Sequence, residues 1–183
     1  MRVSQNGAMT DDAPGPSGPP DLHDPHVLGP GLLPTPFTAD EIRVACGSGR
    51  TMRLLVEEPD GERFERISRF RDCDDEGATL ERWRVAADGG IDGEVASGRI
   101  TWRELQEHAA FPADRTTMST ETLELPIGRV ECLRYDTRDD DSADAPVAKF
   151  WFARSHQGMP VYREEPTPAG VQRTTMVEVE VAP

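Results

Sequence analysis

The chain has 183 residues, a formal net charge of −14 at pH 7 and a pI near 4.6. This length fits one domain with a hydrophobic core better than two full domains. The negative charge argues against a nucleic-acid backbone or an anionic membrane as partner, because no cluster of lysine and arginine is present to offset the repulsion. A neutral or basic partner is therefore favoured.

The first twenty residues contain no apolar stretch of the kind found in secretory signals. No later apolar run approaches the roughly 20 residues that a membrane-spanning helix needs. The three cysteines, Cys46, Cys73 and Cys132, show no C-x-x-C spacing, which is typical of free thiols in a reducing compartment. We therefore expect a cytoplasmic protein with no structural zinc and no cofactor.

Residues 1–36 are rich in proline and glycine, which together occupy 13 of the 36 positions. Such a composition is typical of disordered segments. We expect a disordered tail over residues 1–36 and a single β-rich domain over residues 37–183. Two histidines of the tail, His23 and His26, could bind a metal weakly, but ordering a mobile segment around an ion costs entropy, so we expect no metal site.

Two short helices are predicted from complete start signals. Thr38 and Glu41 have the spacing of a capping box, with Phe37 and Ile42 at the staple positions, and Gly47 ends this helix. The same devices recur at residues 100–105, where Thr101 and Glu104 form the box. The second helix presents Trp102, Leu105 and Ala109 on one face and ends before Pro112.

The remaining chain reads as short strands separated by turns, without the alternation of strands and helices that marks a parallel sheet. The expected strands are 51–58, 62–71, 79–85, 91–96, 120–125, 129–135, 148–153, 159–165 and 172–181. The fold class is therefore α+β, mainly β: a curved antiparallel meander, or half-barrel, of eight or nine strands. One of its two short helices should pack on the sheet.

The sequence contains no strong catalytic signature. A nucleophilic set could be drawn from Cys132 with His108 or His156, but Cys132 lies in the middle of a predicted strand, where a buried, inert thiol is the usual outcome. Two acidic groups could attract a cation, yet neither has the glycine and glutamate spacing of a calcium loop, so solvated loops are the default interpretation. These groups are Asp72, Asp74, Asp75, Glu76 and Asp139, Asp140, Asp141, Asp144.

An aromatic run, "KFWFA", is the most informative stretch. In a strand, Phe150 and Phe152 point to one face of the sheet and Trp151 points to the other. Both faces are therefore expected to be covered at this point, one of them by Trp102 and Leu105 of the second helix. The cover of the other face could be a curved part of the sheet, a partner subunit or a ligand.

The order "LPIGRVECLRYDTR", an acidic loop, "KFWFARSHQGMPVYREE" and a final alternating strand, over residues 126–181, resembles β-rich families of the bacterial lipoprotein-carrier type. The resemblance implies a curved antiparallel sheet that partly wraps helices and can hold lipid in its concavity. The resemblance rests on this pattern of strands and not on any catalytic signature.

These observations favour a non-enzymatic binding module that takes a hydrophobic small molecule, a lipid or a protein partner at the curved sheet. The candidate ligand-binding residues are Trp102, Phe150, Trp151 and Phe152. Two alternatives remain open. One is a small-substrate enzyme that uses Cys132 or a His/Asp pair, and the other is an acidic interaction module that binds a basic partner.

Overall fold

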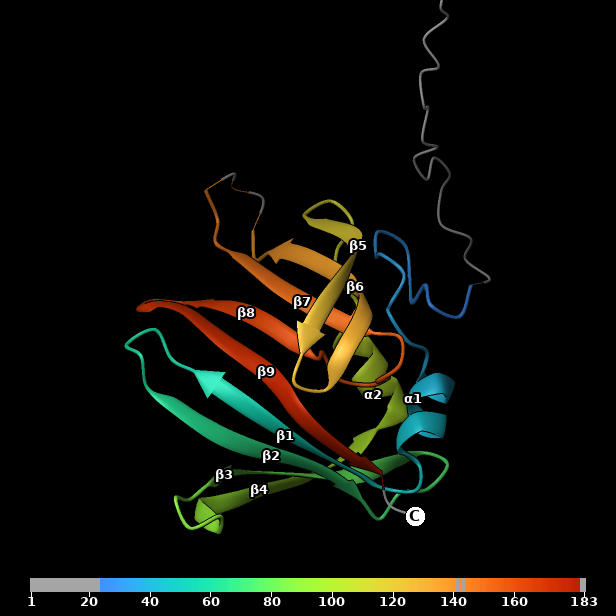
Figure 1. The fold of residues 1–183 in the computed structure, drawn as a ribbon. Coiled ribbons are helices and arrows are strands. Elements are labelled where there is room, and N and C mark those ends of the chain that lie inside the picture. Colours follow the sequence, from blue (N-terminus) through green and yellow to red (C-terminus); the bar gives the residue numbers. More distant parts are fainter. Residues whose placement is uncertain (1–23, 141, 143, 182–183) are drawn as a thin grey trace, which may run out of the picture.

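The computed structural model describes residues 24–140, 142 and 144–181. Within them, nine strands form one antiparallel sheet in the order β4-β3-β2-β1-β9-β8-β7-β6-β5, accompanied by two helices (Figure 1). The elements are α1 (Ala39–Cys46), β1 (Arg50–Glu57), β2 (Arg63–Arg71), β3 (Gly77–Val85), β4 (Ile91–Thr101), α2 (Trp102–Glu107), β5 (Thr116–Leu125), β6 (Gly128–Arg138), β7 (Val147–Ala153), β8 (Tyr162–Thr167) and β9 (Gly170–Val181). The expected fold class is confirmed.

The sheet consists of two meanders. Strands β1 to β4 follow one another outward on one side, and β5 to β9 return from the opposite edge to the centre, where β9 pairs with β1. Helix α2 carries the chain from the edge strand β4 to the other edge strand, β5. The central β1–β9 pair therefore joins segments that are more than a hundred residues apart, such as Arg53 and Glu178.

Both helices begin as the sequence predicted. The Thr38 hydroxyl accepts a hydrogen bond from the Glu41 N–H, and the Thr101 hydroxyl accepts one from the Glu104 N–H. In return, the backbone N–H of each threonine donates to the carboxylate of that glutamate. These reciprocal bonds satisfy amides that would otherwise have no partner in the first turn. None of the helices in the described part of the chain is long and apolar enough to cross a membrane.

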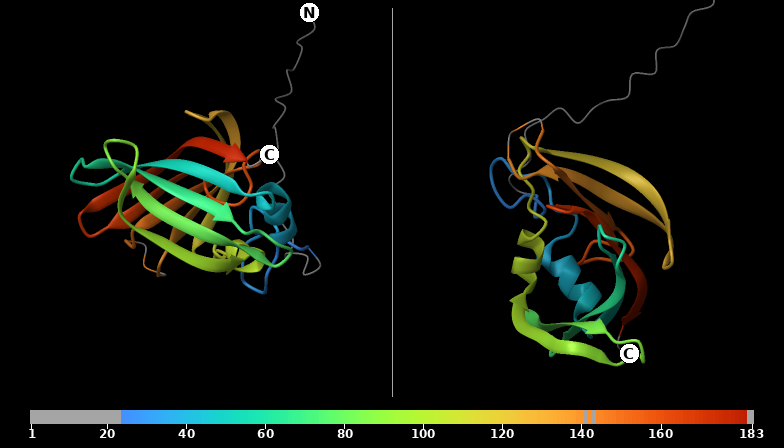
Figure 2. Two further views of the ribbon diagram at one scale, coloured as in Figure 1. Left: turned by 90° about the horizontal axis from the view of Figure 1, so that it is seen from below. Right: turned by 90° about the vertical axis from the view of Figure 1, so that its left-hand side faces the viewer.

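The sheet is open and curves around the two helices, which cover one end of its concave side (Figure 2). Helix α2 contacts β3 and β4 as well as α1. Its Trp102 packs on Phe70 of β2, with ring centroids 6.2 Å apart, so Phe70 marks the inner face of that strand. Side chains from α1, such as Ile42 and Cys46, complete the same core.

Residues 24–36, which we expected to belong to the disordered tail, lie against the domain. Thr35 is 2% exposed, and its N–H donates to the His26 carbonyl at 2.8 Å. Leu33 donates to the Phe111 carbonyl at 2.9 Å. Proline and glycine fix turns here, so composition alone misplaced the start of the ordered chain by at least these residues. The division into a tail and one domain stays a prediction, because residues 1–23 lie outside the described ones.

The edge strand β4 is longer than predicted and leads directly into α2. Its first nine residues are exposed, so no alternation of apolar and polar residues marks it in the sequence. Backbone pairing with β3 nevertheless continues to Thr101, opposite Gly77. A side chain at Gly77 would place its Cβ 2.1 Å from the Ile100 carbonyl oxygen, so glycine is required for this close approach.

Candidate functional site

Two of the four predicted ligand-binding residues lie in the core between the helices and the sheet. Trp102 is 2% exposed, and its indole N–H donates to the Asp74 carbonyl at 2.9 Å. Phe152 is 4% exposed and meets Phe37 and Tyr135 edge to face, with centroids 6.2 and 5.8 Å apart. Both side chains are therefore buried by contacts with other residues of this protein.

Phe150 lies at the border of this core. It is half-buried and stacks on Phe111, with centroids 5.3 Å apart. Phe111 in turn packs on Tyr135, whose hydroxyl donates to the Pro34 carbonyl at 2.8 Å. Burial raises the pKa of Tyr135, so this hydroxyl stays a donor throughout the neutral range. The segment before α1 and the segment after α2 thus cover this part of the inner face.

Trp151 points to the opposite face, as predicted, and its cover is now identified. Its indole N–H donates to Glu121 Oε2 at 2.8 Å, and the Arg134 guanidinium lies 4.9 Å from its ring. Tyr162 packs beside it at 4.8 Å. Strand β5, which supplies Glu121, also contacts β9. Neighbouring strands therefore cover the second face of β7.

Replacing Trp151 by phenylalanine should remove one charge-assisted hydrogen bond and cost about 1–2 kcal/mol of unfolding free energy at pH 7. The hydrogen bond from Trp151, followed by Arg134, holds the pKa of Glu121 below its usual range. A lowered folded-state pKa contributes stability above the unfolded pKa and loses it as the pH falls through the folded one. Urea titrations should therefore show the difference between the two proteins shrinking toward pH 3. A difference in unfolding free energy that stays constant with pH would contradict a hydrogen bond to the ionised carboxylate.

The nucleophilic set drawn from the sequence is not assembled. Cys132 is 0% exposed, and burial, followed by the charges of Glu121 and Glu131, raises the pKa of its thiol to about 11. His108 caps the end of α2 and is exposed, and the ring of His156 contacts the hydroxyl of Ser155 at 2.9 Å. Cys132 is therefore an inert core thiol rather than an activated nucleophile.

Native alkylation tests this conclusion. With iodoacetamide at pH 8, Cys132 should stay unmodified in the folded protein and react fully after unfolding, because neither access nor thiolate is available in the native state. Cys73, which is partly exposed, is the internal control and should react first. Peptide mass spectrometry that finds Cys132 labelled as fast as Cys73 would restore the thiol enzyme as a candidate.

The first acidic group organises a loop. Asp74 Oδ1 accepts hydrogen bonds from the N–H groups of Glu76 and Gly77, both at 2.9 Å, and Oδ2 pairs with Arg99. The first two bonds hold the pKa of Asp74 below its usual range, and Arg99 lowers it further. The described residues contain no group of three or more histidine, cysteine or acidic side chains placed to hold a metal.

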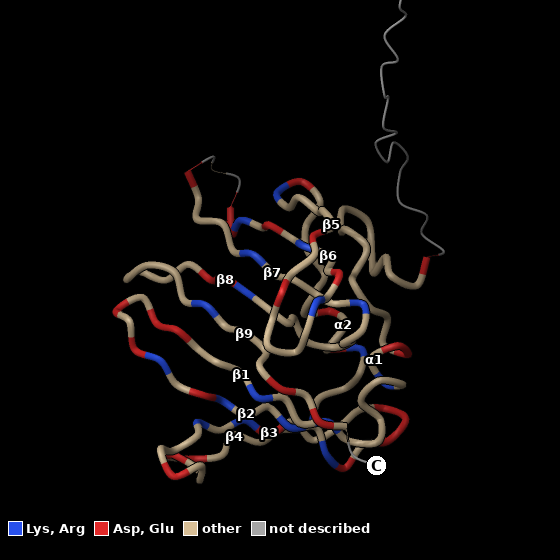
Figure 3. The backbone as a smooth tube through the Cα atoms, viewed as in Figure 1, with Lys and Arg blue, Asp and Glu red and all other residues tan. Residues whose placement is uncertain are grey.

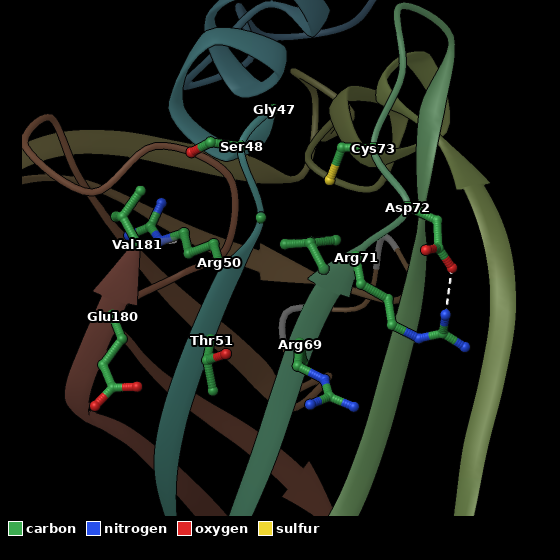
Figure 4. A pocket seen from close by; sticks show the side chains of 12 residues that line it. Gly47, Ser48, Arg50, Thr51, Arg69, Arg71, Asp72, Cys73, Glu180 and Val181 are labelled. Atoms are coloured by element: carbon green, nitrogen blue, oxygen red, sulfur yellow. Dashed lines mark hydrogen bonds and ion pairs between the residues drawn. The ribbon is translucent and has the colours of Figure 1, made fainter. Parts of the chain in front are cut away.

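A polar cleft of about 520 Å³ lies where α1 is followed by β1 (Figure 4). Arg50, which lines this cleft, is 5% exposed, and its Nη1 donates to the Gln157 carbonyl at 2.5 Å. Arg71 and Asp72 pair with each other at the rim. The other lining residues are Gly47, Ser48, Gly49, Thr51, Arg69, Phe70, Cys73, Glu180 and Val181. No residue of the predicted site lies in this cleft.

The end of the concave side away from the helices has a different lining. Phe70 marks the inner face of β2, so Ser68 and Arg66, at alternate positions of the same strand, face the same side. On β8, Arg163 lies opposite Phe150 and therefore also faces inward. Nothing in the sequence indicated this arrangement, because the side of a strand that faces the helices depends on the order of the strands.

Comparisons with solved structures find likenesses of fold at low identity. The crystal structure of MucB has a TM-score of 0.50 and 10% identity, over 78% of this chain and 56% of that one. MucB is also known in complex with MucA(peri). A protein from Bacteroides fragilis NCTC 9343, described as exported with a YmcC-like fold, has a TM-score of 0.42 and 11% identity, over 74% of this chain and 97% of that one. A domain from Vibrio parahaemolyticus, described as from an outer membrane lipoprotein-sorting protein, has a TM-score of 0.28 and 8% identity, over 78% of this chain and 90% of that one.

The fold of this chain is thus similar to that of MucB, in keeping with the predicted resemblance to β-rich families of the lipoprotein-carrier type. The chain spans about half of the MucB chain that it matches. No family model matches the sequence, and no curated protein matches it.

The expected cytoplasmic location is contradicted by the same neighbours, two of which are described as exported and as outer-membrane lipoprotein-sorting. That expectation rested on the lack of an apolar stretch in the first twenty residues and on unpaired cysteines. Neither feature decides a compartment, since both are compatible with more than one location. We therefore withdraw it.

Proposed function

We propose that this protein is a binding module that takes an apolar or amphiphilic small molecule on the concave side of its open sheet. One observation carries the proposal: the helices cover only one end of the concave side, and the sheet continues beyond them (Figure 2). An open, curved sheet whose inner face carries apolar side chains and arginines offers both kinds of contact to a ligand. The likeness of fold to lipoprotein-sorting proteins supports this proposal.

The four aromatic residues predicted from the sequence have different roles in this proposal. Trp102, Trp151 and Phe152 have their contacts satisfied within the chain, so we assign them to positioning the sheet and helices. Phe150 is half-buried and lies beside Arg163 on the inner face. It is therefore the member of the set that we propose contacts the ligand directly.

Native mass spectrometry of the purified full-length protein, with solvent extraction of anything bound, tests the function. We expect a ligand of a few hundred daltons, or stoichiometric uptake of an added amphiphile. In the variant Trp83→Phe with Trp151→Phe, which leaves Trp102 as the one tryptophan of the sequence, the fluorescence should change little on uptake, because Phe70 and Asp74 close the environment of Trp102. A protein that carries nothing and takes up no amphiphile from a panel of neutral, anionic and cationic detergents would contradict the proposal.

A protein partner is a second candidate, favoured by the exposed edge of the sheet. Strand β4 leaves one side of its backbone unpaired and exposes Ile91 by 55% and Val95 by 39%. Such an edge can accept an additional strand from another chain. MucB, whose fold is similar, is known in a complex with another protein.

The double variant Ile91→Lys with Val95→Lys tests this second candidate. It should lose a partner that the wild type retains after cross-linking in its native extract, since lysine on an edge strand discourages pairing. The matched control is Val171→Lys, at an equally exposed position on β9. A partner captured equally by all three proteins would place the interface away from β4.

A further inference from the structure

Arginines on the two faces of the sheet differ in their surroundings. On the outer face five arginines each have a carboxylate: Arg53 lies 2.7 Å from Glu65, and Arg69 lies 2.6 Å from Glu81. The same holds for Arg71, Arg134 and Arg173, with Glu81, Asp136 and Glu164. The excess of acidic residues in the chain is thus partly matched by basic residues on this side.

Three strands, β2, β3 and β8, contribute basic residues to the inner face, and Figure 3 marks the basic positions along the backbone. Arg82 lies opposite Ser68, and Arg66 lies opposite Leu54, so both share the face of Phe70. Among the described residues, neither Arg66 nor Arg82 has a carboxylate within ion-pair distance, whereas Arg163 pairs with Glu165 at 2.9 Å. A fourth arginine of this face, Arg84, lies opposite Arg66 and pairs with Glu62 at 2.6 Å and with Asp92 at 3.3 Å. The uncompensated group on this face is therefore Arg66, Arg82 and Arg163, which have one close carboxylate among them.

These charges lie close enough to affect one another. Burial lowers the pKa of Arg66, and the positive charges of Arg163 and Arg82 lower it further. Arg82 lies nearer to solvent, and partial desolvation followed by Arg163 lowers its pKa in the same direction. Like charges that are held together without counter-ions are unfavourable in an empty protein and become favourable when an anion binds.

Buried polar atoms without partners surround the same arginines. The Nε of Arg66 has no hydrogen-bond acceptor among the described residues. The hydroxyl of Ser68, 0% exposed and opposite Arg82, is unpartnered, and so is that of Thr174, 4% exposed and opposite Arg163. Buried polar groups are nearly always satisfied, so several unsatisfied ones on one face point to a missing polar ligand or to ordered water.

Apolar side chains adjoin the arginines. Phe64 of β2 is partly exposed and lies under the guanidinium of Arg84 at 4.3 Å, while Leu54 and Val56 of β1 are buried beside it. Phe150 adjoins Arg163. The surface thus combines a positively charged centre with an apolar surround, which matches a molecule that has an anionic head and a hydrocarbon tail.

We propose that Arg66, Arg82 and Arg163 bind the anionic head group, carboxylate or phosphate, of an amphiphile whose tail lies on the adjoining apolar inner face. This inference rests on the proposed function and defines its ligand class. The arginines lie inside the curve of the sheet, so a small amphiphile reaches them more readily than a folded acidic protein does.

The test measures binding by isothermal calorimetry, with dodecyl phosphate and dodecanoate as anionic probes and dodecyl maltoside as the neutral one, all below their micelle concentrations. The wild type should bind an anionic probe at least about tenfold more tightly than the neutral one. The double variant Arg66→Gln with Arg82→Gln should lose that preference. The control Arg129→Gln, whose side chain is 75% exposed on β6, removes a charge elsewhere and should bind as the wild type does.

Thermal melting of the ligand-free variants gives an independent readout. Arg66→Gln should melt no lower than the wild type, because the substitution relieves repulsion and the burial of an unpaired charge. A large loss of stability would assign Arg66 to the fold and overturn the ligand role. Dodecanoate has one methylene fewer in its tail than dodecyl phosphate, which accounts for about a fourfold difference in affinity. A larger difference between the two probes identifies carboxylate or phosphate as the preferred head group.

The remaining outcomes separate this inference from the function beneath it. Equal binding of dodecyl maltoside and the anionic probes, unchanged in the double variant, would overturn the head-group assignment and leave the binding module intact. Inorganic phosphate that competes as strongly as dodecyl phosphate would assign the site to a free anion and overturn the amphiphile. Failure of all three probes to bind would contradict both proposals.

Discussion

Replacing Phe152 by alanine is expected to lower the free energy of unfolding by about 3–5 kcal/mol. The ring is 4% exposed and lies between Phe37 and Tyr135, with Phe111 at 6.5 Å, so its loss leaves a cavity that three rigid aromatic neighbours fill poorly. Edge-to-face pairs add to the loss beyond the buried area. Chemical denaturation monitored by circular dichroism measures the change.

The matched control for Phe152 is Val44→Ala on the outer side of α1, where the valine is 79% exposed and the cost should stay within about 0.5 kcal/mol. A loss below about 1 kcal/mol for Phe152→Ala would mean that this ring does not support the core. It would then return to the set of residues that are free to contact a ligand, and our division of the aromatic strand would fail.

The second large effect is expected for Gln106→Ala, at about 2–4 kcal/mol. This amide is 2% exposed and connects three segments. Its oxygen accepts from the Ala39 N–H at 3.0 Å, and its nitrogen donates to the Pro25 carbonyl at 2.9 Å and to the Thr35 hydroxyl at 3.0 Å. Alanine would leave these buried groups without a partner.

Hydrogen exchange localises the effect of Gln106→Ala. The amides of Leu33 and Thr35, which bond to Phe111 and His26, should exchange much faster in the variant, whereas the centre of the β1–β9 pair should change less. The control is Glu107→Gln, one residue further along and about half exposed, which should be nearly neutral. Unchanged protection at residues 33 and 35 would show that Gln106 does not hold this segment.

Local signals in the sequence predicted local structure well. The capping boxes at Thr38 and Thr101 are complete within four residues, so both helix starts were predicted correctly. Gly158, in the turn after β7, adopts a positive φ of 112°, which glycine tolerates. The alternation of Phe150, Trp151 and Phe152 across the strand also followed from the period of two.

Features that depend on distant pairing could not be predicted. The pairing of β1 with β9 joins the two meanders, and no short motif encodes it. The cover of Trp151 by Glu121 comes from a strand thirty residues earlier. The inner position of Arg66 and Arg163 depends on which side of each strand faces the helices, a property of the assembled sheet. The candidate site therefore became visible only in the fold.

The most direct test of the account is the binding surface itself, mapped by amide and side-chain NMR of the full-length protein during titration with dodecyl phosphate. We predict that the largest shifts fall on the inner side of β2, β3 and β8, at the guanidinium groups of Arg66, Arg82 and Arg163 and on the ring of Phe150. Shifts confined to the outer face, to the edge strand β4 or to the cleft at Arg50 would contradict a ligand held on the concave side of the sheet.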